Sequence, residues 1–157
     1  IVELAKKDAQ DNVYMGNAFM NLRKMEVSKV APNRAALIGK FNQSMNSGNM
    51  SAMKEVEKAD KKWLCILFGI PYEAEFQGEG TGSAAHVYNE CGEEVLTYTE
   101  GVGWQEKETK AESQVHSALK LTYYEAFCDA RKALNSEQRT GGMNENIMSQ
   151  DNFDMKA

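Results

Sequence analysis

The chain has 157 residues, of which 42% are hydrophobic and 26% are charged, and its formal net charge is −5. This length and composition are typical of one globular domain with appendages, large enough to bury a core of normal size. The longest apolar run, residues 63–68, is far shorter than the roughly 20 residues of a membrane-spanning helix, so no such helix is predicted.

Helices are predicted throughout the first 70 residues. The first covers residues 2–29 and is weakest near Gly16. The second covers residues 32–48, opened by a proline and closed by a glycine, and the third covers residues 51–68, opened by a serine that can cap it. Residues 1–50 are expected to form an N-terminal helical extension. The apolar positions that recur at helical spacing are Met15, Phe19, Leu22, Met25, Leu37, Ile38, Phe41, Met45, Met53, Val56, Ala59, Trp63, Ile66 and Leu67.

Three short strands are predicted next, at residues 72–76, 84–88 and 94–99. Glycines interrupt the chain between them, which is typical of tight turns. Side chains alternate along these runs, as in strands with one covered face and one wet face. The segment therefore predicts an antiparallel meander. The turn glycines are Gly78, Gly80, Gly82 and Gly92, the last of which follows Cys91.

A long helical pattern follows the strands and is broken after Arg139 by Gly141 and Gly142. One face of this helix carries a stripe of large apolar residues, and the stripe beside it consists of small residues. Small residues allow a helix to approach a sheet closely. We expect this helix to cover the meander. The large stripe contains Leu119, Tyr123, Phe127, Ala130 and Leu134, and the small one contains Ala111, Val115, Ala118, Thr122 and Ala126.

These elements predict an α+β fold in which N-terminal helices precede a three-stranded antiparallel meander covered by the long C-terminal helix. The expected domain organisation is an extension at 1–50, an α-β-β-β-α domain at 51–138 and a flexible or docking tail at 139–157.

Charge is segregated along the chain. Residues 1–70 carry 11 Lys/Arg and 7 Asp/Glu, whereas residues 71–106 carry eight Glu and no Lys or Arg. An acidic surface of this kind repels phosphate, because non-specific nucleic-acid affinity comes mainly from Lys and Arg. The basic positions of the first half are expected to form a patch for RNA, for an acidic meander of another copy, or ordinary helix surface. These positions are Arg23, Lys24, Lys29, Arg34, Lys40, Lys58, Lys61 and Lys62.

The order helix, three strands, helix over about residues 51–134 resembles the double-stranded RNA-binding domain. The resemblance rests on the Gly-rich turn leading to His86, on the Cys91-Gly92 hairpin and on the segment GVGWQEKETKAESQVHSAL at 101–119. In that family, lysines at the start of the last helix hold phosphates, and the first helix and a strand loop reach the minor grooves. The comparable positions here are Gly101, Gly103, Lys107, Lys110, Ala111, Val115 and Ala118.

The resemblance implies an RNA surface at the start of the last helix and on the helix before the strands. The family's lysine doublet is absent here and the sheet segment is acidic, so this surface is expected to be eroded. The RNA-binding candidates are Lys107, Lys110, His86, Lys58, Lys61 and Lys62.

No catalytic, metal or cofactor motif is predicted, and no small-molecule ligand is indicated. The chain has an odd number of cysteines, and they are widely spaced: Cys65, Cys91 and Cys128. This pattern favours a reducing intracellular compartment (cytoplasm or organelle) over a secreted disulfide scaffold. Cys65 and Cys128 are predicted to be small core residues. Use of Cys91 or Cys128 in a small cysteine-dependent enzyme is an alternative.

The sequence favours a non-catalytic structural subunit of a larger protein or ribonucleoprotein assembly, with other protein subunits as partners. Flexible Met and Phe side chains repack easily against partners, and the expected docking residues are Met15, Phe19, Met25 and Phe153. The alternative is a module that binds structured RNA.

Overall fold

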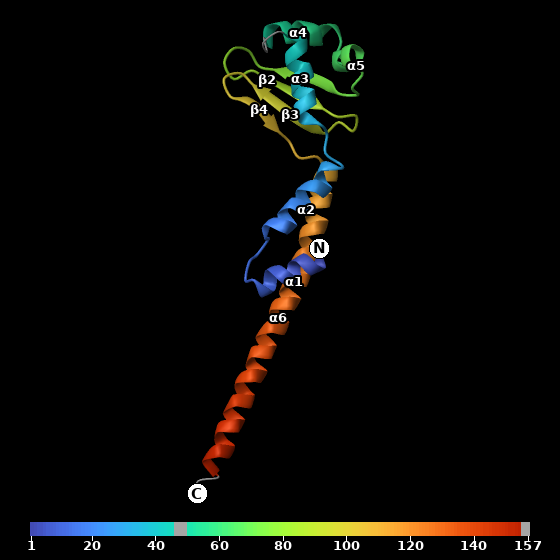
Figure 1. Cartoon of the computed structure of the whole chain (residues 1–157). Coiled ribbons are helices and arrows are strands. Elements are labelled where there is room, and N and C mark those ends of the chain that lie inside the picture. Colours follow the sequence, from blue (N-terminus) through green and yellow to red (C-terminus); the bar gives the residue numbers. More distant parts are fainter. Residues whose placement is uncertain (46–49, 155–157) are drawn as a thin grey trace. The chain divides into compact units, whose positions relative to one another are not determined.

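The computed structural model describes the backbone of residues 1–45 and 50–154 and the side chains of residues 1–45 and 50–141. The regular secondary structure of these residues consists of helices and one four-stranded antiparallel sheet, which confirms the predicted α+β class (Figure 1). The structure adds a fourth strand to the three that were predicted. Among the helices of the described residues, none combines the length and apolar character that crossing a membrane requires.

The chain forms two compact units. The helical unit contains residues 1–27 and the chain from residue 115 onward, and the sheet unit contains residues 28–114. This division differs from the predicted boundaries after residues 50 and 138, because the first two helices assemble with the last one.

The described part of the helical unit is built from α1 (Val2–Gln10), α2 (Asn17–Ser28) and the part of α6 (Lys110–Asp154) that follows residue 114. The fully buried side chains of Ala5, Phe19 and Tyr123 form the centre of its core.

Two predictions for these helices were wrong. The single helix expected over residues 2–29 is interrupted at residues 11–16, where Asn12 and Met15 have left-handed φ values of 56° and 53°. The break expected at Gly141 and Gly142 is absent, because α6 continues through both glycines.

Among its described residues, the sheet unit contains three helices and the four strands. The helices are α3 (Arg34–Ser44), α4 (Met50–Ala59) and α5 (Trp63–Phe68), so the helix predicted over 51–68 is divided at residues 60–62. The strands are β1 (Glu73–Gln77), β2 (Ala84–Tyr88), β3 (Glu94–Thr99) and β4 (Gly103–Glu106), in the order β1-β2-β3-β4.

Strand pairing separates a core face from an outer face. Ala74 lies opposite Val87, which lies opposite Leu96, and all three are fully buried. The neighbouring residues, such as Glu75 and its partner His86, point to the other face.

The helices α3, α4 and α5 cover the core face (Figure 1), which corrects the prediction that α6 covers the sheet. The large stripe of α6 packs around Tyr123 with α1 and α2 instead. In addition, Ile66 and Leu67 on α5 are 65% and 59% exposed, although both belong to the apolar positions that recur there at helical spacing. The buried core of the sheet unit is Leu37, Phe41, Met45, Met50, Met53, Trp63, Leu64, Ala74, Ala85, Val87, Val95 and Leu96.

Two glycines of the sheet unit give a matched pair of predictions. Gly69 ends α5 at a φ of 66°, so we expect Gly69→Ala to destabilise the protein by about 1 kcal/mol. Gly39 lies inside α3 with nothing within 4 Å of an added Cβ, so Gly39→Ala is expected to stabilise it by about 0.5–1 kcal/mol. Urea denaturation measures both, and shifts of the two variants in the same direction would contradict the assignment of these backbone conformations.

Candidate protein-docking groove

Carboxylates cap the start of α6. The backbone N–H of Thr109 donates to Glu112 Oε2 at 2.7 Å, and the backbone N–H of Glu112 donates to Thr109 Oγ1 at 3.3 Å. This reciprocal pair is a capping box. The backbone N–H of Lys110 donates to Oε2 of Glu93 at 2.6 Å, so the β2–β3 hairpin is joined to the same helix end.

Arg34, at the first position of α3, ties this helix start to the sheet. Its guanidinium donates to both carboxylate oxygens of Glu112 at 2.8 Å and to the carbonyl oxygen of Val95 at 3.1 Å, and it also donates to the carbonyl oxygen of Lys107. Only 8% of Arg34 is exposed. The hydrogen bonds from Arg34 lower the pKa of Glu112 to about 2, so the pair is ionised at neutral pH. The expectation that Arg34 belongs to an exposed basic patch was wrong.

The hairpin between β2 and β3 is fixed by the side chain of Asn89. Its Oδ1 accepts from the backbone N–H of Cys91 at 3.0 Å and from that of Glu93 at 2.9 Å. Gly92 completes the turn with a φ of 77°, in the left-handed region that glycine adopts freely. The turn holds Glu90 and Cys91 exposed at its tip.

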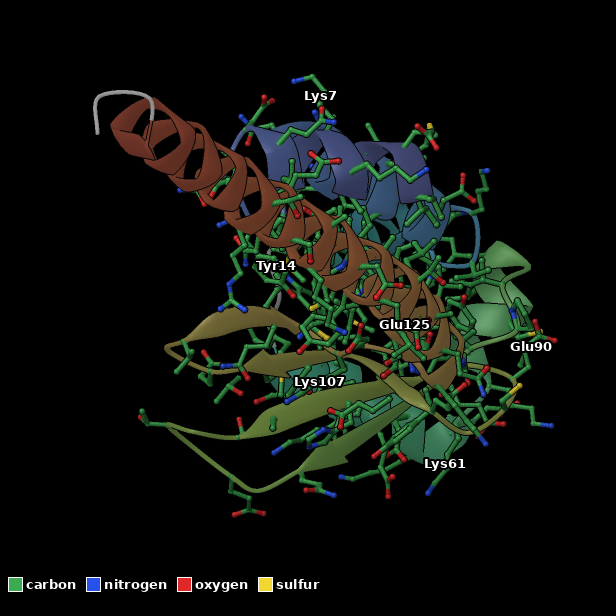
Figure 2. All side chains as sticks on the ribbon, turned by 90° about the horizontal axis from the view of Figure 1, so that it is seen from below. Lys7, Tyr14, Lys61, Glu90, Lys107 and Glu125 are labelled. Atoms are coloured by element: carbon green, nitrogen blue, oxygen red, sulfur yellow. The ribbon has the colours of Figure 1, made fainter. Side chains whose placement is uncertain are left out.

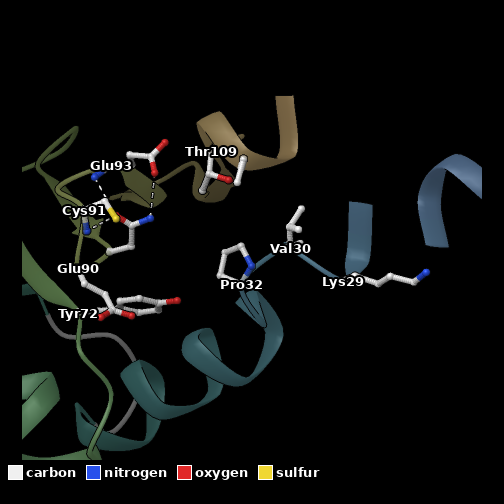
Figure 3. A pocket seen from close by; sticks show the side chains of 11 residues that line it. Lys29, Val30, Pro32, Tyr72, Glu90, Cys91, Glu93 and Thr109 are labelled. Atoms are coloured by element: carbon white, nitrogen blue, oxygen red, sulfur yellow. Dashed lines mark hydrogen bonds between the residues drawn. The ribbon is translucent and has the colours of Figure 1, made fainter. Parts of the chain in front are cut away.

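A groove runs along this hairpin, and we call it the Tyr72 groove. Its first compartment, of about 340 Å³, is lined by Tyr72, residues 29–32, the hairpin tip and the start of α6 (Figure 3). The second compartment, of about 330 Å³, is lined by Pro71, Glu73, Glu75, Tyr88, Asn89, Glu90 and Gly92. A smaller apolar notch of about 150 Å³ adjoins the first at Tyr72 and is lined by Asn33, Ala36, Leu37, Lys40, Ile70, Pro71 and Tyr72.

Carboxylates lie near both tyrosines of the groove. Burial raises the pKa of Tyr72 and the nearby Glu90 carboxylate raises it further, while the charge of Arg34 acts in the opposite direction. Burial also raises the pKa of Tyr88, together with Glu94 and Glu75. Both phenols are therefore neutral at physiological pH. The charged groups that line the groove are the carboxylates of Glu73, Glu75, Glu90 and Glu93 and the ammonium groups of Lys29 and Lys40.

His86 lies on the outer face of the sheet and is engaged by a carboxylate. Its Nδ1 lies 2.6 Å from Glu94 Oε1, an oxygen that also accepts a hydrogen bond from the hydroxyl of Thr97. Partial burial tends to raise the pKa of Glu94, but these two hydrogen bonds outweigh it and the pKa lies below its usual value. His86, an RNA candidate, is thus part of an acidic cluster.

The predicted RNA-binding lysines do not gather into one patch. Lys58 pairs with Glu55 at 2.6 Å, Lys61 lies 3.9 Å from both Glu57 and Glu75, and Lys62 lies 4.0 Å from Glu73. In contrast, Lys107 and Lys110 flank the start of α6. Figure 2 shows Lys61 and Lys107 at different places on the sheet unit.

The predicted docking residues have different surroundings. Phe19 is fully buried and stacks on Tyr123 with ring centroids 4.0 Å apart, so it serves the core of the helical unit. Met15 is half-buried against the same core, whereas Met25 is 53% exposed. Phe153 lies outside the residues whose side chains are described.

None of the three cysteines is fully buried. Cys65 and Cys91 are exposed and Cys128 is half-buried, which corrects the prediction that Cys65 is a core residue. Within residues 1–45 and 50–141, no three His, Cys, Asp or Glu side chains lie where they could hold one metal ion.

The groove was not predicted from the sequence, although Lys29, Lys40 and Cys91, which line it, were named for other roles. Tyr72 was assigned only to a strand, and Glu90 only to the acidic segment. One pattern could have located the frame of the site, because Thr109 followed three residues later by Glu112 is a capping-box signature. Comparison with known proteins adds no relatives: no family model, curated protein or solved structure matches this chain.

Proposed function

We propose that this chain is a non-catalytic interaction subunit whose sheet unit docks a positively charged segment of another protein. The observation that supports this most is the Tyr72 groove, a concave surface where aromatic and apolar side chains adjoin the carboxylates of Glu73, Glu75 and Glu90. A mixed lining of this kind suits a protein segment, because apolar contacts provide affinity and charges provide orientation.

Charge complementarity supports a cationic partner. Residues 71–106 carry eight Glu and no Lys or Arg, and all residues that line the second compartment come from this segment. Complementary charge accelerates association and disfavours acidic partners by like-charge repulsion.

The groove is also fixed before a partner arrives. The hydrogen bonds of Arg34 hold α3, β3 and the start of α6 together, and those of Asn89 hold the hairpin. Binding to a surface that is already ordered costs less conformational entropy.

The test uses two short labelled peptides of equal length and apolar content, one with net positive and one with net negative charge. The full chain is expected to bind the positive peptide, and Glu90→Lys should weaken that binding by about tenfold. Glu125→Lys makes the same charge change on the helical unit (Figure 2) and should leave the affinity within about twofold. Fluorescence anisotropy measures these affinities, and equal affinity for the two peptides would contradict the proposal.

Titration with a labelled double-stranded RNA tests the alternative function, binding of structured RNA. The resemblance places a phosphate at the start of α6, but there the backbone N–H groups of Thr109 and Lys110 already donate to carboxylates. If RNA binds there nevertheless, its affinity should fall steeply with salt, and joint replacement of Lys107 and Lys110 by Glu should abolish it.

A further inference from the structure

We infer that the Tyr72 groove recognises two basic side chains, Lys or Arg, carried by one segment of the partner, with one side chain in each compartment. This inference rests on the proposed function and specifies the chemistry of the docked segment. It follows from the way the groove repeats the same elements, a tyrosine beside carboxylates, in two adjoining compartments.

The first compartment offers a ring, a carboxylate and an apolar wall. Figure 3 shows the Tyr72 ring beneath the hairpin tip with its hydroxyl end toward Pro32, while the Lys29 ammonium points away from both. The Glu90 carboxylate is close enough to Tyr72 to raise its pKa. A cation over a tyrosine ring is attracted by the ring's negative face, and its alkyl stem can pack against Pro32. The compartment therefore fits a long basic side chain.

The second compartment offers a tyrosine and two carboxylates on one sheet face. Glu73 and Glu75 are two residues apart on β1, and Tyr88 is the cross-strand partner of Glu73. Lys61 and Lys62 approach these glutamates only at 3.9 and 4.0 Å, and their side chains are 60% and 69% exposed. Ion pairs of this length and exposure contribute little to stability, so an incoming cation can replace them.

Shared walls indicate that the two cations lie on one segment. Asn89 and Glu90 line both compartments. In an extended chain, alternate side chains point to the same side and lie roughly 6.5–7 Å apart, so two basic residues separated by one residue can enter neighbouring compartments. Because Glu90 borders both, its loss should reduce affinity more than the loss of Glu73 or of Glu75.

The experiment titrates the full chain with peptides in which arginine is replaced by citrulline, a neutral side chain of nearly the same shape. One peptide has two arginines separated by a single residue, others have either or both replaced, and another has the two arginines at opposite ends. The closely spaced pair is expected to bind at least about tenfold tighter than each of the others. Tyr72→Leu and Glu90→Gln should each remove most of this advantage, and Glu125→Gln on the helical unit should not.

A thermodynamic cycle tests whether Glu90 interacts with the charge of the peptide arginines. Glu90→Gln should weaken binding of the two-arginine peptide and have no effect on the double-citrulline peptide, and circular dichroism verifies that the variants remain folded. Equal affinity for the close and the separated arginine pairs, or affinities unchanged by both Tyr72→Leu and Glu90→Gln, would overturn the inference. In that case, a preference of the wild-type chain for cationic peptides would keep the proposed function. Failure of every cationic peptide to bind would overturn both.

Discussion

Replacing Arg34 by alanine is expected to destabilise the protein by about 3–5 kcal/mol, the largest effect that we predict for a single substitution in the sheet unit. Arg34 and Glu112 are 8% and 5% exposed and share two hydrogen bonds of 2.8 Å. Without the guanidinium, the Glu112 carboxylate would remain buried without its charge partner, and the carbonyl oxygens of Val95 and Lys107 would lose a donor. Urea denaturation of wild type and Arg34→Ala measures the difference.

Two control variants separate the loss of the pair from the loss of volume. Arg34→Lys keeps the charge but cannot reproduce the forked contact, so an intermediate loss is expected. Replacing both partners, as in Arg34→Met with Glu112→Leu, should recover much of the stability, because no uncompensated charge is left buried. If Arg34→Ala costs less than about 1 kcal/mol, as exposed ion pairs do, the buried pair is not formed in solution.

The same pair predicts how stability depends on pH. The pKa of Glu112 is lowered from 4.5 to about 2 in the folded protein, so folding favours the ionised form. The resulting stabilisation, about 3 kcal/mol, is complete above pH ~4.5 and is lost as the pH falls toward ~2. Glu112→Gln should lack this contribution, so the difference in unfolding free energy between wild type and variant should shrink over that window. A difference that stays constant with pH would contradict it.

Local patterns predicted the local structure of the sheet. Alternation along residues 84–88 and glycines between the strands were sufficient to place the meander, and the structure confirms it. The last strand was missed because β4 has only four residues and begins at Gly103. A run this short contains too few side chains to show an alternating pattern.

The partners of each helix could not be derived in the same way. The stripe containing Tyr123 identifies an apolar face of α6, but such a stripe fits a sheet or another helix equally well. Arginine is usually an exposed residue, so the burial of Arg34 could not be expected. Its partner Glu112 lies 78 positions away in the chain. The groove depends on the same kind of long-range meeting, because Pro32, Tyr72 and Glu90 come from three separate connecting segments.

Replacing Tyr123 by alanine is expected to destabilise the helical unit by about 3–5 kcal/mol. Its side chain is fully buried, its ring stacks on Phe19, and the two form the centre of the core together with Ala5. Removing the ring would leave a cavity between α1, α2 and α6, because close-packed surroundings relax only in part. Thermal denaturation followed by circular dichroism measures the loss, and a change below about 1 kcal/mol would show that this core is not packed.

The hydroxyl of Tyr123 has a separate role that Tyr123→Phe isolates. It donates to Asp8 Oδ2 at 2.6 Å and accepts from the backbone N–H of Met15 at 2.8 Å, while Asp8 also accepts from the backbone N–H of Gly16 at 2.9 Å. Burial and the bond to Asp8 raise the pKa of Tyr123 to about 12, so the hydroxyl remains a donor at physiological pH. Tyr123→Phe keeps the ring and leaves the Met15 N–H without this acceptor, so a loss of about 1–2 kcal/mol is expected.

Gly16→Ala should disrupt the same hydrogen bonds through Asp8. An added Cβ would lie 2.5 Å from Asp8 Oδ1, so the carboxylate would have to move. The substitution should therefore cost about as much as Tyr123→Phe, and the two losses should be less than additive, because both disrupt the contacts of Asp8. Full additivity in the double variant would mean that the tyrosine hydroxyl and the Asp8 carboxylate do not act together.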